Sequence, residues 1–162
     1  MTSKAFQAFA FAMLAGWSAT AAPQQASPAR AMPLMDRDKE IALALSACPA
    51  ALAGKAGVYV LADSGYIKVR ESQNGFTAIV QHSLPTTQEP RCMDAEGTRT
   101  HLLRILKIAE LRPQGKTPDE IKNYVADAFA KGIFQPPIRP GIDYMLSPEI
   151  VTLVKESVGS QA

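Results

Sequence analysis

The sequence predicts a small α+β domain, in which an antiparallel three-stranded meander packs with about three to four helices. Two patterns lead to this prediction. From Gly57 the apolar residues recur with a period of two, which is typical of strands, and from Leu102 they recur with helical spacing. The chain has 162 residues, which suits one folded domain. We expect a secretory signal peptide over residues 1–21, a flexible leader over 22–35 and the single domain over 36–158.

The N-terminal segment has the three-part pattern of a secretory signal peptide. Lys4 supplies a positive charge, residues 5–15 form an apolar run, and Ala19, Thr20 and Ala21 suit a signal peptidase. We therefore expect cleavage after Ala21 and export to the periplasm or the exterior. A buried N-terminal helix is the alternative, which the Pro- and Gln-rich leader disfavours. The run is shorter than the roughly 20 residues of a membrane span, so no stable anchor is expected after cleavage.

A second export signal competes with this interpretation. Residues 45–48 resemble the lipobox of bacterial lipoproteins, in which the final cysteine is acylated. A lipobox closes the hydrophobic segment directly, whereas here the charged residues of segment 36–40 separate the two. Cleavage after Ala21 is therefore favoured over lipidation of Cys48.

A helix is expected before the strands. Asp36 or Asp38 can cap it, and its apolar stripe continues through Ala47. Pro49 then ends the helix or starts a short turn.

Three consecutive strands follow this helix. The first is expected over residues 57–61 and the second over 66–72. Asn74 and Gly75 give the strongest hairpin signal in the chain, because both tolerate the positive φ angles of a type I′ turn. The third strand is expected over residues 76–82, and hairpin connections would make the meander antiparallel.

Two further helices are expected after a proline-containing loop over residues 84–94. Thr98 or Thr100 would cap the first of them. The second has the clearest boundaries, a capping box with proline at its start and glycine at its end. These boundary residues are Thr117, Pro118, Glu120 and Gly132. Its predicted buried stripe consists of Ile121, Tyr124, Val125, Ala128 and Phe129. A short strand over 142–146 and a last helix from Ser147 complete the expected domain.

The chain has two cysteines, Cys48 and Cys92. In an exported protein they can form one disulfide, and two free thiols are the alternative. Neither the C-x-x-C motif nor the Cys and His spacing of a zinc site occurs, so the sequence gives little support to redox catalysis or thiolate metal binding.

The densest polar cluster lies where the loop is expected to meet a helix. Asp94, Glu96 and His101 offer oxygen and nitrogen ligands for a divalent metal, with His82 as a fourth. The same cluster is the candidate for acid/base catalysis. Their spacing matches no metal motif, and no phosphate-binding loop is present, so no cofactor is expected. In the alternative, Asp94 and Glu96 stabilise the positive end of the following helix dipole.

A second candidate surface lies on the second expected strand. Tyr66, Lys68 and Arg70 alternate along one side, a mixture that suits a binding face for an acidic or carbohydrate-like partner. In the alternative, the tyrosines bridge core and solvent and the basic residues serve solubility.

Three sequence blocks resemble a group of uncharacterised exported bacterial proteins. They are Asn74-Gly75-Phe76, Cys92-Met93-Asp94-Ala95-Glu96-Gly97, and Pro140-Gly141 followed by Tyr144-Met145-Leu146-Ser147-Pro148. The resemblance implies an exported protein and supplies no catalytic residues. Relatives often carry cysteine at the position of Ala78, near Cys92, which leaves the pairing of Cys48 with Cys92 open. They also often continue beyond the third block, which suggests that this chain lacks part of a site.

These observations predict a non-enzymatic binding or envelope-associated module. The sequence contains neither a nucleophile elbow nor a phosphate-binding motif. Its partner is expected to be an envelope component or a protein, and the net charge of +2 does not favour a nucleic acid. The alternative is a metal-assisted or acid/base hydrolase that uses the Asp/Glu/His cluster.

Overall fold

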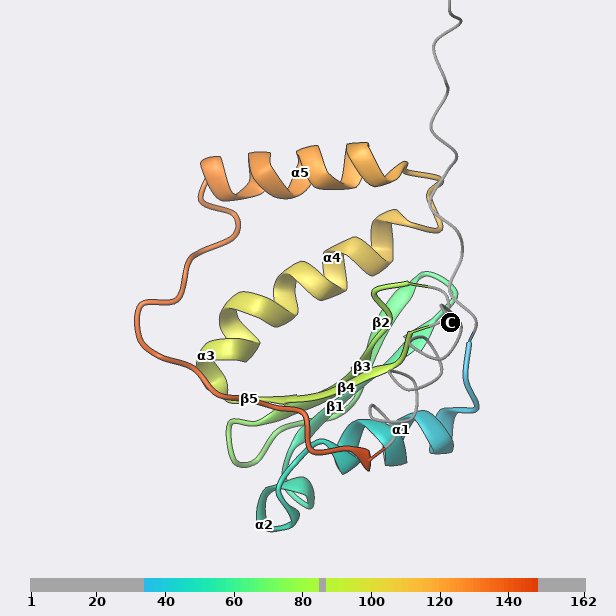
Figure 1. Ribbon diagram of the computed structural model, residues 1–162, viewed down its shortest axis with the longest axis vertical. Coiled ribbons are helices and arrows are strands. Elements are labelled where there is room, and N and C mark those ends of the chain that lie inside the picture. Colours follow the sequence, from blue (N-terminus) through green and yellow to red (C-terminus); the bar gives the residue numbers. More distant parts are fainter. Residues whose placement is uncertain (1–33, 85–86, 149–162) are drawn as a thin grey trace, which may run out of the picture.

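The computed structural model describes residues 34–84 and 87–148. The expected signal peptide and nearly all of the leader and of the last helix lie outside these residues. In the described part, a sheet carries α1 on one face and α4 on the other, and α5 lies over α4 (Figure 1). The α+β class is therefore confirmed.

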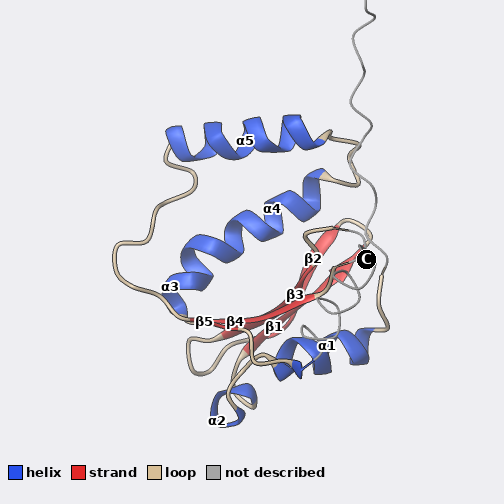
Figure 2. Cartoon of the chain, viewed as in Figure 1, coloured by secondary structure: helices blue, strands red, loops and turns tan. Residues whose placement is uncertain are grey.

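Along the described chain, α1 and α2 precede four consecutive strands, and the remaining helices lie between the fourth strand and the last one (Figure 2). The helices are α1 (Arg37–Ser46), α2 (Ala50–Ala53), α3 (Ala95–Gly97), α4 (Leu103–Leu111) and α5 (Pro118–Ala130), with a π-helical segment η1 (Thr98–Leu102) joining α3 to α4. The strands are β1 (Gly57–Ala62), β2 (Gly65–Arg70), β3 (Thr77–Gln81), β4 (Glu89–Met93) and β5 (Asp143–Tyr144), in the spatial order β2-β1-β3-β4-β5.

The sheet is mixed, so the expected antiparallel three-stranded meander is wrong. β1 pairs with β2 in antiparallel and with β3 in parallel, and β2 and β3 are not neighbours. The segment after β2 crosses the start of β1, where the backbone N–H of Gly57 donates to the carbonyl of Phe76 at 2.8 Å. A Cβ on Gly57 would lie 3.1 Å from the backbone nitrogen of Ser72, so this crossing leaves little room for a side chain at position 57.

Asn74 and Gly75 belong to this crossing segment and not to a hairpin. Gly75 has a φ of 79°, whereas no described residue other than glycine has a positive φ, so Asn74 does not adopt the type I′ pattern. The Asn74 amide instead donates to the carbonyl of Leu52 at 2.9 Å. Its side-chain oxygen accepts from the N–H of Phe76 at 3.1 Å. The side chain of Asn74 thus ties the crossing to α2.

Strand β4 lies inside the segment 84–94, which the sequence predicted as a loop. It pairs with β3 in antiparallel, and β5 pairs only with Cys92 and Met93. Pro90 is tolerated because the partner strand β5 does not extend to it. The expected strand over 142–146 is reduced to the two residues of β5.

The caps expected for α1 and α5 are confirmed. The Asp36 side chain accepts the backbone N–H of Lys39 at 3.1 Å. Thr117 and Glu120 form both hydrogen bonds of the capping box. Gly132 follows α5 with a φ of 69°, a conformation that favours glycine.

The core has one part on each face of the sheet. Its fully buried members toward α1 include Ala44, Ala47, Val58, Ala78 and Val80. Its buried members toward α4 are Ile79, Met93, Leu102 and Ile105. Within the described part of the chain, no helix is long and apolar enough to cross a membrane.

A disulfide between Cys48 and Cys92 joins the end of α1 to β4, with 5.1 Å between the two Cα atoms. The sequence left open whether the two cysteines are paired or free, and in the structure they form a disulfide. The bridge uses the sulfur atom that lipidation of Cys48 would need. Ala78, the position at which the resemblance implies a cysteine near Cys92, lies directly across from Cys92 on β3.

Candidate functional site

A cleft of about 480 Å³ lies between the helical run α3–η1–α4 and the segment from α5 to β5. That segment passes around the start of the helical run before it reaches the sheet (Figure 1). The charged and titratable residues of its lining are Glu96, His101, Arg104 and Asp143. The apolar ones include Met93, Phe129, Pro136, Pro137 and Ile142. The volume and the mixed lining are typical of a small-molecule site.

The helical run starts earlier than the sequence predicted, because Asp94 caps it. Oδ1 of Asp94 accepts the backbone N–H of Gly97 at 2.8 Å. Neither Thr98 nor Thr100 is the cap, and the Thr100 hydroxyl donates to the carbonyl of Glu96 at 2.8 Å. The early start places Glu96 in the first turn, beside the cleft. Asp94 therefore has the helix-stabilising role of the alternative interpretation.

Glu96 is buried, with 3% of its surface exposed, and connects the helical run to the α5–β5 segment. Its carboxylate accepts from Nη2 of Arg99 at 2.6 Å and from the N–H of Ile138 at 2.9 Å. Nε of Arg139 lies 3.5 Å from it. The hydrogen bond from Arg99 is the main reason that the pKa of Glu96 is lowered. Glu96 is thus an ionised anchor for the segment that closes the cleft.

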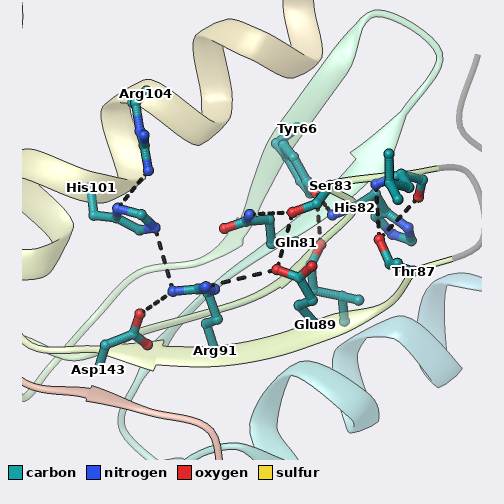
Figure 3. Close-up of polar contacts among 12 residues, drawn as sticks. Tyr66, Gln81, His82, Ser83, Thr87, Glu89, Arg91, His101, Arg104 and Asp143 are labelled. Atoms are coloured by element: carbon teal, nitrogen blue, oxygen red, sulfur yellow. Dashed lines mark hydrogen bonds and ion pairs between the residues drawn. The ribbon is translucent and has the colours of Figure 1, made fainter. Parts of the chain in front are cut away.

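His101 lies between two guanidinium groups (Figure 3). Its Nε2 is 3.4 Å from Nη1 of Arg91, and its Nδ1 is 3.1 Å from Nη2 of Arg104. Burial lowers the pKa of His101 below its usual 6.5, Arg104 and Arg91 lower it further, and the carboxylates of Asp143 and Glu89 oppose the shift less strongly. The imidazole is therefore neutral at neutral pH.

The two arginines beside His101 differ in their acidic partners. Arg91 forms an ion pair with Asp143 and lies 3.7 Å from a carboxylate oxygen of Glu89. Arg104 has no carboxylate partner within residues 34–84 and 87–148. A guanidinium only donates, and a neutral imidazole has one acceptor nitrogen, so His101 can accept from one arginine alone. Hydrogen-bond donors therefore exceed acceptors around Arg104.

We expect His101 to make stability pH-dependent. Because its pKa is lower in the folded chain, the unfolded chain binds more protons between that pKa and 6.5. The unfolding free energy should therefore fall as the pH decreases below about 6.5 and then level off below the folded pKa. Urea unfolding of the wild type and of His101→Gln across this pH range measures the effect. The variant should show a weaker pH dependence, and identical profiles would contradict the assignment.

The four candidate metal ligands are not brought together. Asp94 caps α3, Glu96 binds arginines, and His101 faces the cleft. His82 is buried elsewhere, with Nε2 3.9 Å from Oε1 of Glu40 in α1. In the parts of the chain that the structure describes, no group of three His, Cys, Asp or Glu side chains is arranged to hold a metal ion.

The sequence analysis expected Tyr66, Lys68 and Arg70 to form one exposed binding face. In the structure these residues do not share an exposed face. The Tyr66 hydroxyl donates to a carbonyl of β3 at 2.6 Å, and burial raises its pKa. Arg70 donates from Nε and Nη2 to two backbone carbonyls near α2, at 2.6 Å each. Lys68 is exposed and pairs with Glu71. An irregular register between β1 and β2 separates Lys68 from Arg70.

Arg104, Phe129 and Ile142 were not expected in a site. The helical stripe of α5 predicted Phe129 as buried, but 44% of its surface is exposed and it lines the cleft. α5 packs on α4 as an outer layer, so only part of its apolar stripe is covered (Figure 1). One sequence feature could have pointed to this cleft: segment 133–142 combines several apolar residues with three prolines.

No protein-family model matches the chain, and comparisons with curated proteins and with solved structures find no significant match.

Proposed function

We propose that this protein is an exported, non-enzymatic binding module that holds a small envelope component in the cleft beside α4. The observation that carries the proposal is the composition of the cleft. Exposed apolar side chains of Phe129 and Ile142 lie in the same cleft as the donors of His101 and Arg104. Ligand sites commonly combine an apolar lining with a few polar groups that fix orientation.

Export is supported by two features of the chain. The first is the signal-peptide pattern that ends at Ala21. The second is the disulfide between Cys48 and Cys92, since such bridges persist mainly in oxidising compartments. The resemblance of the three sequence blocks to exported bacterial proteins agrees with this part of the proposal.

The same geometry favours binding over acid/base hydrolysis. A catalytic imidazole is usually oriented by a carboxylate on its second nitrogen, whereas both nitrogens of His101 face arginines. The nearby carboxylates of Glu96 and Asp143 are paired with arginines. About one equivalent of a divalent metal in the purified protein, lost in His101→Ala, would instead favour a metal-assisted hydrolase.

Replacing Phe129 by alanine should weaken binding in the cleft without unfolding the protein, because the side chain is partly exposed. The measurement is a two-dimensional NMR screen of the full chain with a set of small aromatic and aliphatic fragments. Fragments that bind should shift the resonances of Met93, Phe129 and Ile142, and the shifts of Met93 and Ile142 should shrink in Phe129→Ala.

The matched control is Ile133→Ala, which removes another exposed apolar side chain near α5, one that does not line the cleft. It should leave the binding unchanged. Fragment shifts that fall consistently outside the cleft, or an equal loss in both variants, would contradict the proposed site.

A further inference from the structure

We infer that the ligand of this cleft is a monoanion with an apolar body, an alkyl or aryl carboxylate, and that Arg104 binds its carboxylate group. This inference rests on the proposed function of the cleft as a binding site. It names the chemical class of the ligand and assigns a ligand-binding role to Arg104.

The anionic group follows from the balance of donors and acceptors. Arg104 lines the cleft, and its only hydrogen-bonding contact in the described chain is with Nδ1 of His101. If that nitrogen accepts from Arg104, the N–H of the neutral ring lies on Nε2 and faces the donor of Arg91. If the N–H lies on Nδ1, it faces the donor of Arg104. In either tautomer Arg104 retains N–H groups that have no acceptor in the described chain, and a carboxylate in the cleft would accept them.

The geometry of a guanidinium favours a carboxylate in particular. Its parallel N–H groups match the two oxygens of a carboxylate, and such charge-assisted pairs are stronger than neutral hydrogen bonds. Arg91 already pairs with the carboxylate of Asp143, and Arg99 pairs with that of Glu96. Arg104 lines the cleft and keeps its guanidinium available for the carboxylate of a ligand.

A single negative charge fits the cleft better than two. The carboxylates of Glu96 and Asp143 also line the cleft. Together with Glu89, these carboxylates balance the arginines that they contact, which are Arg91, Arg99 and Arg139. One positive charge, that of Arg104, therefore remains without an acidic partner. A phosphate dianion would place its second charge near these carboxylates with no further cation to compensate it.

The apolar part of the ligand follows from the exposed side chains next to the polar cluster. Phe129 and Ile142 have 44% and 48% of their surfaces exposed, and both line the cleft together with Pro136 and Pro137. Covering them by an apolar ligand body removes hydrocarbon surface from water. A carboxylate at Arg104 leaves the remainder of the ligand free to lie along these residues.

The test compares three probes of equal length with the full chain: octanoate, octanamide and octylammonium. Affinities are measured by NMR titration, with the wild type, Arg104→Gln and Lys68→Gln. Octanoate should bind most tightly, and Arg104→Gln should weaken it by about tenfold or more, the loss expected for one charge-assisted interaction. Arg104→Lys, which keeps the charge but not the planar fork, should lie between the two.

Lys68→Gln is the matched control for net charge. It also removes one positive charge, but Lys68 lies on β2, at the edge of the sheet opposite to β5 and the cleft. Octanoate binding should therefore be unchanged in this variant. Equal weakening in Arg104→Gln and Lys68→Gln would show a general charge effect and would overturn the role of Arg104.

The remaining outcomes separate the two proposals. If octanamide binds as tightly as octanoate and the shifts map to the cleft, the anionic ligand class is wrong while the proposed function stands. Tighter binding of octylammonium would overturn the inference in the same way. If none of the three probes shifts a resonance of the cleft, both the inference and the proposed function are wrong.

Discussion

Replacing Cys48 and Cys92 together by serine is expected to lower the free energy of unfolding by about 4 kcal/mol. The disulfide joins positions 44 residues apart in the sequence, so its loss allows the unfolded chain many more conformations. The bridge also ties α1 to β4, the strand that carries Arg91 and Met93 next to the cleft. We therefore expect loss of ligand binding to accompany the loss of stability.

Urea unfolding of the double variant and of the wild type measures this effect. The wild type treated with a thiol reductant should unfold at the same urea concentration as the variant, because both lack the bridge. A variant within about 1 kcal/mol of the oxidised wild type would mean that the bridge contributes little to folding.

Replacing Ile79 by alanine is expected to cost about 2 to 5 kcal/mol of stability, because it opens a cavity in the core between the sheet and α4. Ile79 is completely buried and belongs to the same cluster as Met93, Leu102 and Ile105. This cluster holds the helical run against the sheet and so fixes the position of His101.

Two further variants provide comparisons for the stability loss in Ile79→Ala. Ile79→Val removes one methyl group and should cost about 0.5 to 1.5 kcal/mol. Ile138→Ala, at a residue with 84% of its surface exposed, should change stability by no more than about 0.5 kcal/mol. Similar losses in Ile79→Ala and Ile138→Ala would contradict the assigned core.

The features that the sequence predicted well depend on short-range contacts. Asp36, Thr117 and Glu120 form caps with groups three residues away, so a local pattern contains all the information needed. The disulfide was one of two alternatives because the chain has only two cysteines.

The topology was not predictable from such patterns. Asn74 and Gly75 have the composition of a hairpin turn, but the side chain of Asn74 binds Leu52, a residue 22 positions away. Pro90 obscured β4, because proline is tolerated in a strand only where no partner needs its N–H. That condition depends on how far β5 extends.

The candidate site was predicted in part. His101 and Glu96 were found because charged residues are dense in that stretch, but their roles depend on long-range contacts. Glu96 accepts from the N–H of Ile138, a residue 42 positions away, and this contact shapes the cleft. Phe129 fits a buried helical stripe, and its exposure follows only from the position of α5 above α4. Arg104 had no feature in the sequence that distinguished it from the other arginines.

The most direct test of the central claim is to locate a bound carboxylate by intermolecular nuclear Overhauser effects between octanoate and the full chain. Its methyl protons should contact the ring of Phe129 and the side chain of Ile142, and the protons next to its carboxylate should contact Arg104. Contacts confined to exposed apolar residues away from the cleft, such as Leu34 or Leu84, would contradict the claim that this cleft is the binding site.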